Sequence, residues 1–247
     1  MTLSLPHFEE VPLQRPPVTE VICQVRFPPI LRISAEGPYQ FQDRIREHFP
    51  TFEILQDMLV QAAPLPAQAI MPVYHFKSPD GRSVAALAVN FFAFSTEAYS
   101  SWIDFRKNLT LIARLVRETY SPASAGRIGL RFVNKLTPHN TGFAGLDQLV
   151  HMLTDELIVL YSPPSWTKAE RLETRVVVPD GEATLNLRLV IDPEPYVVLD
   201  FDYYEARDNI PLDELIQKLD RYHDTIYSAF RWSVAQDALA AFLPREP

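Results

Sequence analysis

The sequence contains one cysteine and only seven glycines among its 247 residues, and both shortages restrict its function. A single cysteine, Cys23, excludes a disulfide framework and favours a reducing compartment. No glycine-rich nucleotide-binding loop, cluster of metal ligands or nucleophile signature is present, so we expect no cofactor and no bound metal. These absences leave catalysis open but favour a protein that is not an enzyme.

Long apolar runs are missing as well. No stretch of about 18 uninterrupted apolar residues occurs, and the segment from Met1 to Pro12 has no basic stretch followed by an apolar one. We therefore expect a cytoplasmic protein with no membrane partner. The net charge of −8 disfavours nucleic acid as a partner, because proteins that bind it usually carry a basic face.

The sequence does contain an internal repeat. Pro79-Asp80-Gly81 recurs as Pro179-Asp180-Gly181, and each copy lies between apolar runs typical of strands, at 70–76, 84–94, 172–178 and 184–191. Proline presets φ, aspartate caps its own turn and glycine supplies a positive φ, so each copy predicts a hairpin. We therefore predict two related halves, residues 1–123 with the N-terminal arm and residues 124–247, fused into one structural unit.

Hydrophobic periodicity predicts the remaining elements of each half. In the first half it predicts a strand at 18–27, a helix at 39–48, a helical region that starts at Ser95 or Thr96, and a long amphipathic helix at 101–120. In the second half it predicts a strand at 127–136, a helix at 146–160, a strand at 196–203 and a helix at 211–232 with Pro211 in its first turn.

This order predicts an α+β fold. It consists of two β-α-β-meander-α repeats that form a curved antiparallel sheet with helices on one face. We expect a grip-like saddle of the kind seen in the TATA-binding-protein architecture, an expectation about topology that implies no function.

Alternation along the strands separates an apolar face from a polar face, because successive side chains of a strand point to opposite sides. The polar face, away from the helices, carries the candidate ligand-binding residues Arg26, Arg127, Arg131, Arg188, Asp200 and Asp202. Two interpretations are open. The charges form either a solvated surface of cross-strand pairs or a concave binding groove.

Three polar residues suggest narrower hypotheses. Asp200 and Asp202 lie two positions apart on one strand and could share a divalent cation, but no third ligand is close in sequence. His223 lies among apolar neighbours at helical spacing, which favours a packing role. Asn134 and His223 are therefore second-tier candidates, and we assign no residue as a catalytic or metal-binding group.

Several segments together resemble a sporadically distributed family of uncharacterised bacterial proteins about 250 residues long. The resemblance spans nearly the whole chain, and its most specific part is Arg127-Ile-Gly-Leu-Arg131-Phe-Val-Asn134. Its other parts are 16–21, Val25-Arg26-Phe27, Tyr99-Ser-Ser-Trp102-Ile-Asp-Phe105, Leu199-Asp200-Phe201-Asp202, and His223 with Phe230. The resemblance implies a full-length member of one family, with no established reaction, cofactor or catalytic residues. The patchy distribution is typical of genes in mobile-element or defence contexts.

The leading functional hypothesis is a binding or adaptor protein that holds a protein or a small ligand on the polar sheet face. Two alternatives remain open: a nucleic-acid-binding regulatory protein, and a metal-dependent hydrolase that uses Asp200 and Asp202 with His223. We also expect a homodimer to be compatible with the fold, because exposed edge strands favour self-pairing.

Overall fold

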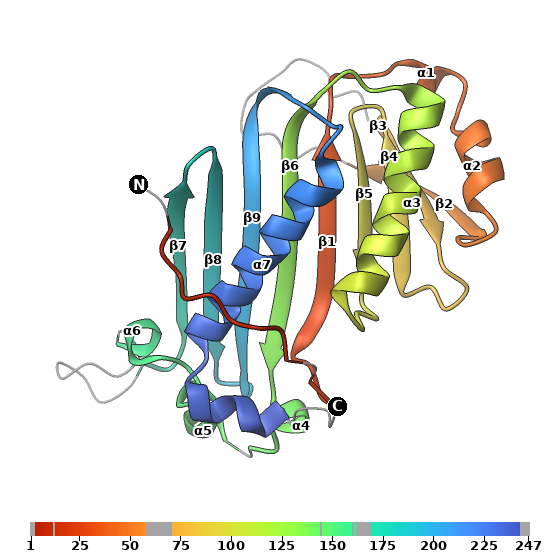
Figure 1. Cartoon of the computed structure of the whole chain (residues 1–247). Helices are drawn as coiled ribbons and strands as arrows, with labels where there is room; N and C mark the ends of the chain where they lie inside the picture. Colours follow the sequence, from red (N-terminus) through yellow and green to blue (C-terminus); the bar gives the residue numbers. More distant parts are fainter. Residues whose placement is uncertain are drawn as a thin grey trace. The chain divides into compact units, whose positions relative to one another are not determined.

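The structure is a computed structural model that describes residues 3–11, 13–57, 71–143, 145–159, 161 and 169–242. Nine strands form an antiparallel sheet in the order β2-β3-β4-β5-β1-β6-β9-β8-β7 (Figure 1). The predicted α+β class and antiparallel sheet are confirmed. None of the helices in the described ranges combines the length and the apolar character that a membrane crossing needs.

The strands and helices have the following bounds. The strands are β1 Val18–Arg26, β2 Thr51–Asp57, β3 Met71–Lys77, β4 Ser83–Ala88, β5 Phe91–Thr96, β6 Ala125–Leu136, β7 Leu172–Asp180, β8 Ala183–Asp192 and β9 Tyr196–Ile210. The helices are α1 Arg32–Ala35, α2 Tyr39–Ile45, α3 Trp102–Tyr120, α4 Pro138–Thr141, α5 Leu146–Val150, α6 Asp155–Ile158 and α7 Leu215–Ser233, and a 3-10 helix, η1, spans Gln236–Phe242.

The chain divides into two compact units. Unit 1 comprises Met1–Val21, Leu130–Glu205 and Lys218–Pro247, and unit 2 comprises Ile22–Gly129 and Ala206–Gln217. The two related halves proposed from the sequence, 1–123 and 124–247, stay a prediction.

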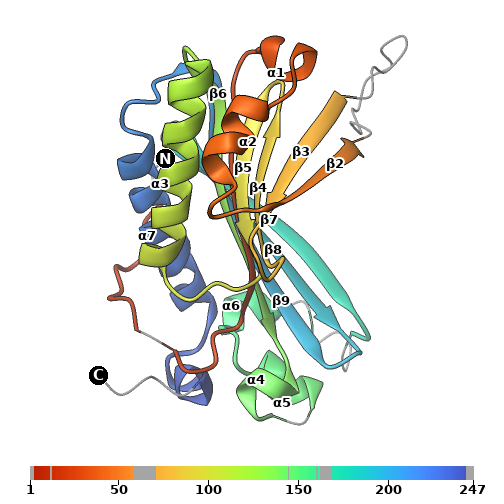
Figure 2. The same ribbon diagram turned by 90° about the vertical axis from the view of Figure 1, so that its right-hand side faces the viewer.

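Unit 2 packs α2 and α3 on one face of its strands (Figure 2). Phe105 of α3 lies 4.8 Å from Phe94 of β5, and Phe41 of α2 lies 5.3 Å from Phe76 of β3, measured between ring centroids. Cys23 of β1 is completely buried, and burial raises the pKa of its thiol to about 12. The ring contacts form an aromatic core between the helices and the strands of unit 2.

Unit 1 packs α7 against β6 and β9. Tyr222 of α7 lies 4.8 Å from Tyr203 of β9, and His223 lies 5.8 Å from Phe132 of β6, between ring centroids. Inward-facing leucines of β8 complete this core, at Leu185, Leu187 and Leu189. The residues that alternate with these core positions therefore point to the opposite face of the strands.

The predicted helix at 146–160 is wrong as a continuous element, because the structure has two short helices there, α5 and α6. The backbone between them pairs with residues 233–235, so the hydrogen bonds that would continue the helix are used elsewhere. These contacts are a bridge between Leu153 and Val234, and hydrogen bonds from Ala235 N to Met152 O (2.8 Å) and from Thr154 N to Ser233 O (3.2 Å).

Several boundaries also differ from the prediction. The last helix starts at Leu215 instead of Pro211, and the preceding residues form a turn with a hydrogen bond from Leu215 N to Leu212 O. Ser95 and Thr96 end a strand, whereas Ser101 is the N-cap of α3, where its hydroxyl accepts from Asp104 N at 3.2 Å. The apolar run 84–94 forms two strands, β4 and β5, and β2 was not predicted at all.

Both copies of the tripeptide form hairpin turns, with φ of +72° at Gly81 and +61° at Gly181. In the first copy, Asp80 caps its own turn as predicted. Its carboxylate accepts hydrogen bonds from the Ser78 hydroxyl (2.5 Å) and from Arg82 N (3.1 Å). These bonds lower the pKa of Asp80.

In the second copy, the prediction that aspartate caps its own turn is wrong. The carboxylate of Asp180 accepts from Tyr203 Oη at 2.7 Å and from Leu3 N at 3.0 Å, both distant in sequence. The hairpin here is also tighter, because Asp180 pairs with Ala183 and only two residues form the loop. The same tripeptide therefore supports a local turn in unit 2 and a tertiary connection in unit 1.

Candidate functional site

A polar hollow of about 260 Å³ lies in unit 1, on the face of β6, β7, β8 and β9 that points away from α7. Alternation puts its side chains there, because Leu187, Leu189 and Phe201 occupy the buried positions between them. The hollow is lined by Arg131, Arg175, Asn186, Arg188, Asp200 and Asp202. Three arginines and two aspartates thus face one small volume in a protein that is acidic as a whole.

The first polar contact of the hollow is a bidentate ion pair. Arg131 donates from Nε to Asp200 Oδ1 and from Nη2 to Asp200 Oδ2, both at 2.8 Å. Asp200 is buried, with 6% of its surface exposed, so the sequence correctly assigns its face but not its burial. The hydrogen bonds to Asp200 raise the pKa of Arg131, and the negative charge of Asp202 adds to this effect.

The second contact crosses from β8 to β7. Arg188 lies directly opposite Asp200 in the strand register, but both oxygens of Asp200 bind Arg131. Arg188 instead donates from Nε to Glu173 Oε1 at 2.9 Å, and its Nη2 lies 2.8 Å from the same oxygen. The other oxygen of this carboxylate accepts from Arg171 Nη2 at 3.3 Å, so Arg188 shares Glu173 with a second arginine.

The third contact pairs an arginine with a neutral amide, and the carboxylate of Asp202 lines the same hollow. Arg175 lies directly opposite Arg188 in the register and donates from Nε to the neutral amide oxygen of Asn186 at 2.7 Å. Within the residues that the structure describes, no carboxylate pairs with Arg175. Like charges at directly opposed positions destabilise a strand pair, so an anion in the hollow would offset a repulsion that is already present.

Two of the predicted site residues, Arg26 and Arg127, belong to unit 2 and are not part of this hollow. Arg26 donates from Nε to Gln24 Oε1 at 2.9 Å and borders another hollow, of about 290 Å³, beside Asp208. The guanidinium of Arg127 covers Gly129, where an added Cβ would come within 2.5 Å of Nη1. A side chain at residue 129 would therefore require the guanidinium of Arg127 to move.

The second-tier residues Asn134 and His223, which were not assigned to the open face, are buried. Asn134 is 3% exposed and donates from Nδ2 to Leu199 O at 3.2 Å, which connects β6 to β9. His223 lies on α7 and packs between Phe132 and Tyr227. Burial lowers the pKa of His223, while the negative charges of Glu10, Asp224 and Asp220 oppose this change.

The structure does not bring the three residues of the hydrolase hypothesis together. Asp200 and Asp202 face the hollow, whereas His223 packs against Phe132, a core residue on the other face of the strands. Among the described residues, no group of three or more His, Cys, Asp or Glu side chains is arranged to hold a metal ion.

Sequence reasoning omits Arg175, Asn186 and Glu173 from the site, although their outward positions are visible in the alternation of β7 and β8. What the sequence cannot supply is the register that puts Arg175 opposite Arg188. A comparison of the chain with models of known protein families and with curated proteins finds no match.

Proposed function

We propose that this protein is a binding or adaptor protein that holds an anionic group of a small ligand or protein partner in the hollow of unit 1. The observation that carries the proposal is the pair of opposed guanidinium groups, Arg175 and Arg188, of which Arg175 bonds only to an amide among the described residues. A carboxylate or phosphate oxygen is the group that such donors recognise best.

The neighbouring contacts support a binding role over a catalytic one. The bidentate pair of Arg131 and Asp200 holds one wall of the hollow in a fixed geometry, and Glu173 holds Arg188. A rigid frame with one incompletely paired donor is suited to recognition, because little side-chain freedom is lost when a ligand binds.

We also propose that the two halves of the chain are related by an internal repeat in a saddle-like fold. The strand order supports the repeat. Reading inward from the two edges, β3-β4-β5-β1 in one half corresponds to β7-β8-β9-β6 in the other, with β2 as an additional edge strand. From the edge of the sheet to its centre, each half therefore contributes the two strands of a hairpin, then a third strand, then the strand that comes first in that half of the chain.

The test compares Arg175→Gln with Arg221→Gln. The control removes the same charge from an exposed position on α7 of the same unit, outside the hollow. Molecules that co-purify with each variant are identified by native mass spectrometry, and the affinities for inorganic phosphate and a tetraglutamate peptide are measured by calorimetry for wild type and both variants. In wild type and Arg221→Gln, the NMR signal of the Arg175 Nε–H group is also followed during the titrations. We expect Arg175→Gln to weaken binding by about tenfold or more, since a hydrogen bond to a charged group contributes about 1.5–3 kcal/mol.

An equal effect of both substitutions would mean that only net charge matters, and would contradict the proposed site. A wild-type protein that retains no molecule and whose Arg175 signal does not move with either probe would also contradict it. Retention of DNA or RNA that is lost as salt rises would favour the nucleic-acid alternative instead.

A further inference from the structure

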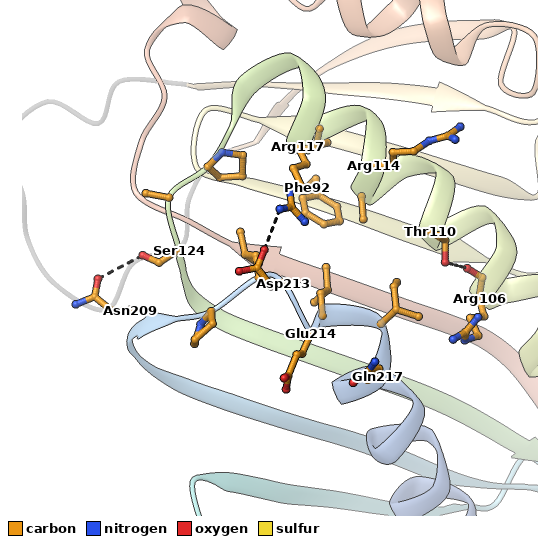
Figure 3. Close-up of a pocket in the computed structure, with 18 residues that line it drawn as sticks. Phe92, Arg106, Thr110, Arg114, Arg117, Ser124, Asn209, Asp213, Glu214 and Gln217 are labelled. Atoms are coloured by element: carbon orange, nitrogen blue, oxygen red, sulfur yellow. Dashed lines mark hydrogen bonds and ion pairs between the residues drawn. The ribbon is translucent and has the colours of Figure 1, made fainter.

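A further hollow, of about 850 Å³, lies in unit 2 between α3 and the segment that leads into α7 (Figure 3). One wall is formed by α3 and the other by residues 209–217. Ser124 and Asn209 lie at one end, where their side chains are joined by a hydrogen bond of 3.3 Å, and Arg106 and Thr110 lie at the other. The volume is within the range of about 300–1,000 Å³ that small-molecule sites occupy.

Short side chains on α3 explain why the hollow is not filled by the protein itself. Arg106, Thr110, Ala113 and Arg117 follow one another at helical spacing and line the hollow from the same side. The two middle side chains are short, and the hydroxyl of Thr110 donates to Arg106 O within the helix at 2.7 Å. The hollow is therefore elongated, because the eleven residue steps from Arg106 to Arg117 span about 16 Å of helix.

The rest of the lining combines apolar residues with the polar side chains of Arg114, Asp213, Glu214 and Gln217. Phe92 of β5 and Val116 of α3 are buried behind the hollow, and the facing segment contributes Pro211, Leu212 and Ile216. An occupant thus meets apolar surface at Phe92, Leu212 and Ile216 and the cationic groups of Arg106 and Arg117.

Arg117 already binds a carboxylate of the protein itself. Its Nη2 donates to Asp213 Oδ1 at 2.9 Å across the hollow (Figure 3), and the two side chains are 66% and 80% exposed. Exposed ion pairs contribute only about 0–1 kcal/mol. The contact with Asp213 therefore shows that Arg117 is oriented to bind a carboxylate. Asp213 itself is held only weakly by this ion pair.

We propose that this hollow is a second ligand site, which binds a small amphipathic carboxylate whose acid group displaces Asp213 from Arg117 and whose apolar body lies against Phe92 and Leu212. The site is formed entirely by residues of unit 2 and does not depend on the proposed function of the hollow in unit 1.

The experiment uses decanoate as the probe and the full chain as the protein, with affinity measured by calorimetry. We expect Arg117→Gln to weaken decanoate binding about tenfold or more, because the charged donor is lost. Asp213→Asn should instead tighten binding about threefold, because the competing carboxylate is removed. Ala113→Leu should abolish binding, because it fills the middle of the hollow and keeps a good helix former.

The matched control is Lys107→Gln, which removes one positive charge from an exposed position on α3 outside the hollow and should leave the affinity unchanged. Decan-1-ol should bind at least tenfold more weakly than decanoate, because it lacks the charged acid group. If Arg117→Gln does not fold, Asp213→Asn and Ala113→Leu still decide the question, since they predict opposite effects. The proposal is overturned if wild type does not bind decanoate, if decan-1-ol binds equally well, or if Asp213→Asn weakens binding.

Discussion

The two hairpins built on Pro-Asp-Gly use the same aspartate in different ways. Asp80 bonds to the hydroxyl of Ser78 and to Arg82 N within its own turn, whereas Asp180 bonds to Tyr203 and Leu3. At the position that corresponds to Ser78 the second copy has Val178, which has no hydroxyl. The carboxylate of Asp180 therefore has no such side-chain partner nearby in sequence and is available to more distant donors.

The largest difference is expected from removing each carboxylate. Asp180→Ala leaves the hydroxyl of Tyr203, a residue that is 6% exposed, without its acceptor, and should lower the free energy of unfolding by about 1–3 kcal/mol. Asp80→Ala should cost less, because its partners are exposed and water can replace it. Urea denaturation of both variants measures this, and equal losses would remove the distinction between the two turns.

A smaller difference is expected from the glycines. Both have positive φ, and in the described part of the chain an added Cβ at either meets no atom within 4 Å, so only backbone strain opposes alanine. Gly181→Ala should cost about 1–2 kcal/mol. Gly81→Ala should cost less, because the loop between β3 and β4 is longer and can relax. A larger loss in Gly81→Ala, measured by the same denaturation, would contradict this account.

The smallest effect concerns the first turn alone. Ser78→Val removes the main cause of the lowered pKa of Asp80, so this pKa should rise toward the ordinary value of 3.8. The stabilisation from the ionised carboxylate is present above the unfolded-state pKa and is lost as the pH falls through the lowered pKa of the folded state. Carboxyl NMR titration of wild type and Ser78→Val measures the change in the pKa of Asp80. An unchanged titration midpoint would mean that the hydrogen bond from Arg82 N, and not the one from Ser78, lowers this pKa.

Local patterns predicted most of the fold, because alternating apolar residues specify which face of a strand is buried. They failed where distant backbone determines the outcome. Residues 146–160 have apolar residues at helical spacing, but the backbone near Met152 pairs with residues that follow α7. β2 was missed because Phe52 and Ile54, its alternating apolar residues, are partly exposed on an edge strand and give a weak signal.

The same limit applies to the hollow of unit 1. Alternation correctly assigned Arg131, Arg188, Asp200 and Asp202 to one face, since the side-chain period of a strand is visible in the sequence. It could not show that Asp200 is covered by Arg131, nor that Arg175 faces Arg188. Both depend on strand register, which is set by pairing between segments far apart in the chain.

The burial of Cys23 has a practical consequence for measuring motion in β1. Thiol reagents react with the thiolate, and a pKa of about 12 in a fully buried position keeps this thiol protonated and inaccessible in the native state. Modification then requires the strand to open. Because the chain has one cysteine, the rate of its labelling reports a single opening event, without any need to introduce a probe.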